Sequence, residues 1–436
     1  MPLHRYQRQI AAVLGWFFAA ATIHGHALAQ QNEPLTGTHQ AFAIHSAPAT
    51  PQSPDEVPTL ERVLALARER APEVVVGRAE VEASRSATIG ARVSPFLNPY
   101  VEVIAERGRG VTRDVYITAQ VHTPIEVAGQ RGRRIAEADS FIEWNAATLA
   151  QLRAQISGAV VRTYGECVAG AARYESLTEL LGSAATESKV LAARRDAGDA
   201  TERDAQLAEV ERSRIAVQLD EVRASLGASL NELARLTGRR FSSPDTKQLL
   251  PQTAPGGAAQ GFAPQAPVVL GAEAQARYYN RLDERLERER IPAIGVILQA
   301  GRGDFGEMRL GAGLAWSLPT FRYNQGERAK AQADGMRARI AASVYRDSIA
   351  QRLSSIAGES EHLRAAIERL DREAIPAAAR ATESATRMQL AGKTDLLSVV
   401  VARRDFYVLR LRRLEIAERI WSLLGDWVEL SGRMPR

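Results

Sequence analysis

Two hydrophobic patterns alternate along this chain. Thr59–Arg92 carries apolar side chains at spacings of three and four, which predicts a helix with one buried stripe. Two segments follow, Val101–Arg107 and Val115–His122, in which every second residue is apolar, and this alternation predicts two strands. After Gly129 the helical spacing resumes and continues without proline to about Asp196. At about 1.5 Å per residue this helix would be about 100 Å long, which is a coiled-coil length.

The same order of patterns then occurs a second time. Two more strands are predicted at Ile294–Ala300 and Met308–Trp316, and a second long helix from Gln325 to about Leu390 contains Pro376, which should kink it. Ala197–Gly238 aligns without a gap with Ala391–Gly432, and both segments end in Leu-(Thr/Ser)-Gly. Proline and glycine positions recur at offsets of 193 to 195 residues throughout. The sequence therefore indicates a tandem duplication.

The ends and the junction of the repeats have different compositions. A basic start, an apolar run and the small-x-small sequence Ala27-Leu28-Ala29 predict a secretory signal peptide cleaved near Ala29-Gln30, and no cysteine follows for a lipid anchor. The stretch before the first helix and the junction are rich in Pro, Gly, Ala and Gln. The expected organisation is a signal peptide (1–29), a disordered segment (30–58), repeat 1 (59–241), a linker (242–265) and repeat 2 (266–432).

Composition excludes several classes of function. Among 436 residues, 56 basic and 51 acidic side chains leave a formal charge of +5 without a polybasic block, so nucleic-acid binding is not expected. Cys167 is the only cysteine, which excludes a disulfide framework. Of seven histidines, only His122 and His362 lie in predicted helices or strands. No catalytic residues, cofactor or metal site are predicted.

Four predicted strands per chain are too few to close a membrane barrel, but their length and alternation match one. Several chains could each contribute four strands to one barrel, and three chains would give twelve. The long helices would then extend away from the membrane, which suggests a trans-periplasmic tube.

With these features the chain resembles the TolC-like outer-membrane factor family, from about Leu60 to Gly432. The resemblance is carried by Ala71-Pro72-Glu73-Val74, the two strand pairs, Pro124 and Pro319 at the strand-to-helix passages, and the Ala-Gly and Leu-(Ser/Thr)-Gly motifs. Within the family it is similar to the CzcC-type heavy-metal cation efflux branch in two junction segments, residues 125–131 and 318–326.

The resemblance implies a mainly α fold with a small β part, in which antiparallel coiled-coil helices form an α-barrel tunnel. The four strands would join a homotrimeric, twelve-stranded barrel in outer-membrane lipid. It implies a periplasmic adaptor protein and an inner-membrane resistance-nodulation-division pump as partners. The chain would be a passive efflux duct and not an enzyme.

The family places adaptor docking and the tunnel constriction at the helix-hairpin tips. Carried over by position, docking falls on two short segments: Ala197, Gly198, Asp199, Ala200 and Thr201 in repeat 1, and Ala391, Gly392, Lys393 and Thr394 in repeat 2. Asp204 stands where the family has a constriction carboxylate, and a threefold ring of it would attract cations. The equivalent position in repeat 2 is Ser398, with Asp395 as the nearest acid.

Two kinds of alternative stay open. The same architecture could serve drug efflux or type I protein secretion. A protein of another class, a secreted coiled-coil or adhesin-like structural protein, would have the long helices without a channel. Asp204 could also merely cap a helix or face solvent.

Overall fold

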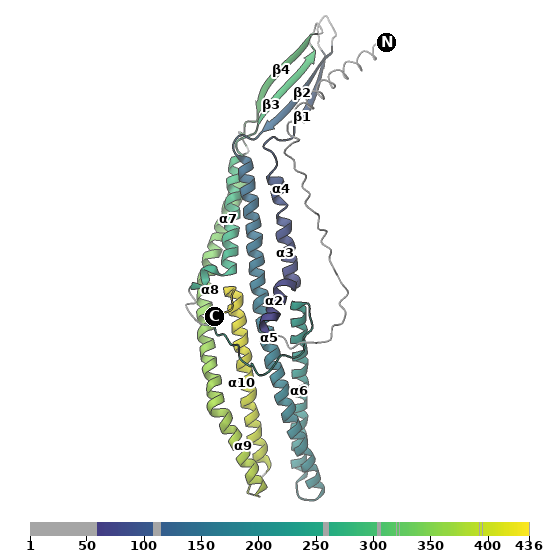
Figure 1. Ribbon diagram of the computed structural model, residues 1–436, viewed down its shortest axis with the longest axis vertical. Helices are drawn as coiled ribbons and strands as arrows, with labels where there is room; N and C mark the ends of the chain where they lie inside the picture. Colours follow the sequence, from purple (N-terminus) through teal and green to yellow (C-terminus); the bar gives the residue numbers. More distant parts are fainter. Residues whose placement is uncertain are drawn as a thin grey trace, which may run out of the picture. The chain divides into compact units, whose positions relative to one another are not determined.

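The computed structural model describes residues 59–107, 115–255, 261–302, 307–319, 321, 323–391, 393, 394 and 396–435. The expected signal peptide and the segment 30–58 lie outside these residues, as do the turn at 108–110 and Gly303. The described chain divides into a unit built around a β-sheet and a unit built from helices (Figure 1).

The sheet contains four antiparallel strands in the order β1-β2-β3-β4 (Figure 1). They are β1 (Tyr100–Arg107), β2 (Val115–Ile125), β3 (Ile294–Arg302) and β4 (Met308–Trp316). Strand β2 continues beyond the predicted end at His122, because Ile125 still pairs with Ile294 and the Pro124 carbonyl accepts the Leu97 N–H at 2.9 Å. The proline therefore removes one donor without ending the strand.

The register of the strands repeats the offsets seen in the sequence. Val101 of β1 pairs with Val121 of β2. Adding 193 to the first number and 195 to the second gives the pair Ile294 and Trp316, which is the observed register of β3 and β4. The duplication is thus expressed in strand pairing as well as in proline and glycine positions.

Long helices make up most of the remaining described chain. They are α5 (Gln130–Asp196), α6 (Glu202–Thr237), α7 (Pro267–Arg288), α8 (Gln325–Arg369), α9 (Ile375–Leu390) and α10 (Leu396–Ser431). The bounds of α5 agree with the prediction. The mainly α fold with a small antiparallel β part is confirmed.

The first predicted helix is broken into three. Thr59–Arg92 was expected to be continuous, but α2 (Leu60–Arg70), α3 (Pro72–Ser84) and α4 (Ala87–Ala91) replace it. Ala71 has an extended backbone (φ −54°, ψ 131°) because the ring of a following proline disfavours the helical conformation. The apolar stripe hid this break, since Val63 and Val74 are both fully buried on its two sides.

The predicted disturbance at Pro376 is a π-helical turn. Residues Leu370–Ala374 form this turn, which separates α8 from α9. Proline has no N–H and its ring collides with the carbonyl four residues earlier, here that of Arg372. Widening the turn accommodates that collision, because a π-helix bonds residues five apart.

The C-terminal ends of α6 and α10 have the same hydrogen bonding, as expected for a duplication. Gly238 and Gly432 both have positive φ, 69° and 72°. Each donates its N–H at 2.8 Å to the carbonyl four residues earlier, of Ala234 and Val428 respectively. These are left-handed C-caps, for which glycine is favoured because it has no Cβ.

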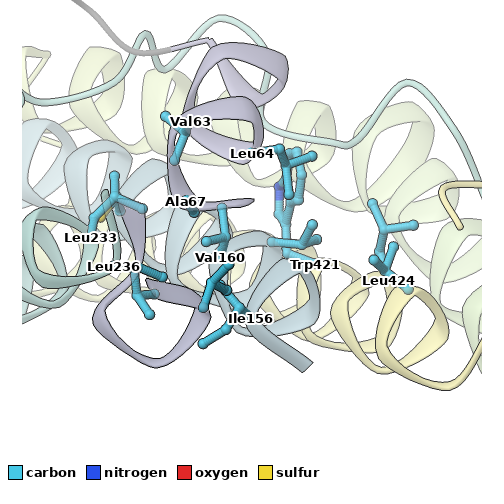
Figure 2. Packing of buried hydrophobic residues seen from close by; sticks show 14 of the residues in the cluster. Val63, Leu64, Ala67, Ile156, Val160, Leu233, Leu236, Trp421 and Leu424 are labelled. Atoms are coloured by element: carbon cyan, nitrogen blue, oxygen red, sulfur yellow. The ribbon is translucent and has the colours of Figure 1, made fainter. Parts of the chain in front are cut away.

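The helical unit is held by a core of aliphatic side chains and one indole. Val63, Leu64 and Ala67 of α2 lie against Ile156 and Val160 of α5, and side chains from α6 and α10 complete the cluster (Figure 2). The further labelled members are Leu233, Leu236, Trp421 and Leu424. The indole N–H of Trp421 donates to the Leu249 carbonyl at 2.9 Å, so part of the linker segment packs on this core.

Glycines bring α5 and α10 unusually close. A Cβ built on Gly165 would lie 2.1 Å from the Cβ of Trp421, and one on Gly158 would lie 2.7 Å from the Gly425 carbonyl oxygen. Real carbon atoms cannot approach so closely, so the two helix backbones cross where these positions lack side chains.

Ion pairs continue along the same two antiparallel helices. Arg162 contacts Asp426 at 2.9 Å, and Arg410 contacts Glu179 at 3.1 Å. Arg173 with Glu418 and Arg403 with Glu187 lie between and beyond them. Because the pairs advance along α5 while they recede along α10, they align the two helices in one register. None of the helices in the described part of the chain carries an apolar stretch long enough to cross a lipid bilayer.

Candidate functional site

One face of the sheet is apolar and exposed. Paired residues of neighbouring strands share a face, so the register places the predicted apolar positions of all four strands together. The side chains on the two edge strands are the most open to the surroundings: Val101 of β1 is 63% exposed, and Leu310 and Leu314 of β4 are 72% and 64% exposed, whereas Ala119 and Ala300 on the inner strands are buried. Val103, Leu298 and Trp316 are also exposed on this face. A continuous apolar face of this kind marks a surface that contacts something other than water.

The opposite face combines small residues with polar ones. Gly295, Gly301, Gly311 and Gly313 occupy it on β3 and β4, while mostly polar side chains occupy it on β1 and β2, with Ile104 as the apolar exception on β1. At Gly311 an added Cβ would lie 2.6 Å from Nε2 of Gln299, so this amide occupies the space that the glycine leaves. The division into an apolar and a polar face agrees with the sequence prediction.

Three polar groups meet on this second face. His122 is buried, and its Nε2 lies 3.2 Å from Oε1 of Gln120 and 3.5 Å from Oε2 of Glu102. The ring of Tyr100 stacks on the imidazole with centroids 4.5 Å apart. Sequence analysis did not find this cluster, because Glu102 and His122 belong to different strands and come together only through the β1–β2 register.

The two edge strands of the sheet have one partner each. Strand β1 pairs only with β2, and β4 pairs only with β3, in the described chain. The outer backbone groups of both strands can therefore accept a further strand, which in a natural protein is a site of strand addition.

The first hairpin tip lies between α5 and α6. Gly198 has a φ of +82°, its N–H donates to the Arg195 carbonyl at 2.9 Å, and the Asp199 N–H donates to the Arg194 carbonyl at 2.8 Å. This pair of bonds is the Schellman arrangement, which reverses the chain at a left-handed residue. Ala197, Gly198, Asp199 and Thr201 are exposed, and Ala200 is half-buried.

The second tip has an equivalent turn. The Lys393 N–H donates to the Met388 carbonyl at 2.9 Å, which matches the bond from Asp199 to Arg194 at an offset of 194 residues. Ala391 and Lys393 are exposed and Thr394 is half-buried, whereas Gly392 lies outside the described residues. Both tips therefore present short polar turns at the ends of paired helices.

Asp204 has a structural partner. Thr201 is the N-cap of α6, and its hydroxyl accepts the Asp204 N–H at 3.1 Å and donates to Oδ2 of the same residue at 2.7 Å. The pattern Thr-x-x-Asp resembles a capping box, a signal present in the sequence. Asp204 and Ser398 are both exposed, and Asp395 lies outside the described residues. The carboxylate ring thus stays a prediction, and the capping alternative has a geometric basis.

Two side chains of the helical unit, Cys167 and Glu73, have shifted pKa values because of their surroundings. Burial raises the pKa of the Cys167 thiol to about 12, which leaves it protonated. The pKa of Glu73 is lowered by a backbone hydrogen bond near the start of α3 and by the adjacent Arg235 guanidinium, which lies 2.6 Å away. Within the described residues, no three His, Cys, Asp or Glu side chains gather in a group that could hold a metal ion.

Comparisons with curated proteins give two metal-resistance proteins. No protein-family model matches the chain. The chain is 28% identical over 388 residues to the cobalt-zinc-cadmium resistance protein CzcC of Cupriavidus metallidurans, which covers 86% of this chain and 90% of that protein. It is also 28% identical over 286 residues to the nickel-cobalt-cadmium resistance protein NccC of Alcaligenes xylosoxydans xylosoxydans, covering 62% of this chain and 63% of that protein.

Solved structures with the same fold include several channels. A membrane protein from Pseudomonas aeruginosa matches with a TM-score of 0.71 at 17% identity, over 85% of this chain and 89% of that chain. CusC, whose structures concern folding and transmembrane channel formation, matches at 0.68 and 12%, over 86% and 92%. The CmeC outer membrane channel of Campylobacter jejuni matches at 0.69 and 14%, over 85% and 84%. At these identities the likeness establishes the fold.

Proposed function

We infer that this chain is a TolC-like outer-membrane factor of the CzcC type, the passive exit duct of a tripartite efflux system that exports heavy-metal cations. The observation that carries this function is the four-stranded sheet with one exposed apolar face and two open edges. The similarity to CzcC over most of both chains supports the metal cargo, and the names of CzcC and NccC have cobalt and cadmium in common.

The duplication supports closure of the sheet by further copies of the chain. Strands β2 and β3 join repeat 1 to repeat 2, with Val121 opposite Leu298. The same offsets of 195 and 193 turn this pair into Trp316 opposite Ala105, which can be satisfied between β4 of one copy and β1 of the next. Trp316 and Ala105 are on the apolar face, as the pairing requires. Such a head-to-tail contact closes into a ring when the rotation between copies divides a full turn, and this is the closure that we propose.

Three copies agree best with a passage through the ring. Two copies would give eight strands, and a barrel of about eight strands has an interior that side chains fill. Three copies would give twelve strands, with the apolar face toward lipid and the polar, glycine-rich face toward the interior. A homotrimer in the outer membrane, with helices extending into the periplasm, is the assembly we propose.

The hairpin tips are the proposed contact with the periplasmic adaptor, and through it with an inner-membrane resistance-nodulation-division pump. The tip between α5 and α6 exposes Ala197, Gly198 and Asp199. The second tip, between α9 and α10, exposes Ala391 and Lys393. A photo-crosslinking group at Asp199 should capture the adaptor, whereas the same group at Ser225, exposed in the second half of α6 and far along the chain from the tip, should not. Capture from both positions alike would contradict docking at the tips.

Deletion of the gene tests the function and the cargo together. A strain without this chain should lose resistance to Co²⁺ and Cd²⁺, and the wild-type chain supplied from a plasmid should restore it. Unchanged growth in these metals would contradict metal export. Sensitivity only to hydrophobic drugs would favour a drug duct, and loss of a secreted protein would favour type I secretion. A chain that is fully soluble without detergent would favour the coiled-coil structural protein.

A further inference from the structure

The histidine cluster on the polar face of the sheet has the geometry of a cation contact. Nε2 of His122, Oε1 of Gln120 and Oε2 of Glu102 converge from two strands, and Glu102 is directly opposite Gln120 in the register. Each of these atoms can offer a lone pair to a positive ion. The three residue types are those found around borderline transition metals: imidazole, carboxylate and amide oxygen.

The distances agree with shared coordination. A tetrahedral site with metal–ligand bonds of about 2.1 Å has neighbouring ligand atoms about 3.4 Å apart, and an octahedral one has them about 3.0 Å apart. The separations measured from Nε2 are 3.2 Å and 3.5 Å. A cation of this size could therefore bind His122 and either oxygen with little movement of the strands.

One ring nitrogen of His122 faces both oxygens of the cluster. A neutral imidazole nitrogen carries at most one hydrogen, while two acceptor oxygens face Nε2 of His122. In the other tautomer Nε2 is itself an acceptor, and three lone-pair atoms then face one another. A bound cation would accept a lone pair from Nε2 and from a facing oxygen, which removes this repulsion.

Tyr100 keeps the imidazole in place. Its ring lies nearly parallel to that of His122, with an interplanar angle of 9°, and His122 is only 8% exposed. Ile297 of β3 pairs opposite His122 on its other side. The ring is thus fixed by stacking and burial, whereas the Glu102 side chain is half exposed and leaves the cluster open on the polar face of the sheet. A fixed nitrogen with an accessible carboxylate suits a ligand that enters and leaves.

We propose that His122, Glu102 and Gln120 form a contact site for a divalent transition-metal cation on the polar face of the sheet. The imidazole favours Zn²⁺, Co²⁺, Ni²⁺ or Cu²⁺ over Mg²⁺ and Ca²⁺. One carboxylate and two neutral ligands make a weak site completed by water. Weak binding suits a cargo, because a transit position must release what it binds. Binding stands on the geometry alone, and its place in transport rests on the proposed function.

The site is tested with purified, untagged chain in detergent, titrated with Co²⁺ and followed by the visible absorption of the bound ion. We expect one Co²⁺ per chain. The affinity should fall about tenfold or more in His122→Phe, which keeps a ring against Tyr100, and in the isosteric Glu102→Gln. His362→Ala is the matched control, since His362 is exposed on α8, and it should bind as the wild type does.

Three results would overturn the site. These are no stoichiometric Co²⁺ binding to the wild type, wild-type affinity in both His122→Phe and Glu102→Gln, and displacement of Co²⁺ by an equal concentration of Mg²⁺, which would mean carboxylate binding without the imidazole. Unchanged far-ultraviolet circular dichroism in each variant separates lost binding from lost folding. Failure of the binding test leaves the deletion phenotype untouched, so the site and the duct are contradicted by different results.

Discussion

Replacing Gly165 with alanine tests the close crossing of α5 and α10. The new Cβ would lie 2.1 Å from Cβ and 2.3 Å from Cγ of Trp421, whereas carbon atoms in contact are about 3.5 to 4.0 Å apart. The helices would have to separate by about 1.5 Å, or the indole would have to move and lose its bond to the Leu249 carbonyl. Trp421 is buried in the core, so neither movement is free of cost.

These contacts determine how much stability Gly165→Ala should lose. Overpacking a core costs about 1 to 3 kcal/mol, and a lost hydrogen bond adds about 1 kcal/mol. Alanine is favoured over glycine in a helix by about 1 kcal/mol, which offsets part of this. Gly165→Ala should therefore be about 1 to 3 kcal/mol less stable than the wild type.

Gly182→Ala is the matched control on the same helix. An added Cβ there meets nothing within 4 Å, and Gly182 is exposed, so this variant should gain up to about 1 kcal/mol. Guanidinium unfolding followed by circular dichroism and tryptophan fluorescence measures both. Equal unfolding midpoints for the two variants would refute the inferred close contact.

Three further predictions concern the sheet and the helix core. Leu314→Lys puts a charge on the exposed apolar face and should reduce recovery of the chain in the outer-membrane fraction. Gly313→Ser, on the opposite face, is the control and should not reduce it. Equal recovery of the two variants would contradict lipid contact by the apolar face. The pKa of Glu73 is lowered in the folded state, so its contribution to stability is complete above its ordinary pKa and is lost as the pH falls through the folded value. Glu73→Gln should accordingly flatten the loss of stability below about pH 4.5, and an unchanged pH profile would contradict stabilisation of the Glu73 carboxylate by the backbone hydrogen bond and by Arg235. The Cys167 thiol, buried and with a pKa raised to about 12, should resist iodoacetamide at pH 8 until the chain is unfolded, and rapid labelling of native protein would contradict its burial.

Hydrophobic spacing was sufficient to predict most elements of the fold. The residues of α5 follow from uninterrupted helical spacing between Gly129 and Gly198, and the strands follow from alternation that puts one apolar face together. The break at Ala71 was missed because the apolar stripe continues across it, although Pro72 is a visible signal. The resemblance to channel proteins rests on these same regular features.

Contacts between distant segments could not be read in this way. In the sequence Gly158 and Gly165 are only weak helix formers. The structure explains them, because a side chain at either position would collide with α10. The cluster around His122 depends on the register of β1 and β2, because a slip of one residue would put Glu102 and His122 on opposite faces of the sheet. Asp204 shows the opposite case, since Thr201 three residues before it already predicts the cap that the structure contains.

The central claim, a duct closed by copies of this chain, is tested most directly by a disulfide between β4 and β1. Trp316→Cys combined with Ala105→Cys should give, in outer-membrane fractions, cross-linked dimers and trimers and nothing larger, because the third bond closes the ring. Trp316→Cys with Ile104→Cys is the control, since Ile104 belongs to the other face, and it should stay uncross-linked. Buried Cys167 does not compete for oxidation. Chains that remain monomeric, or a ladder that continues beyond three, would contradict the closed duct.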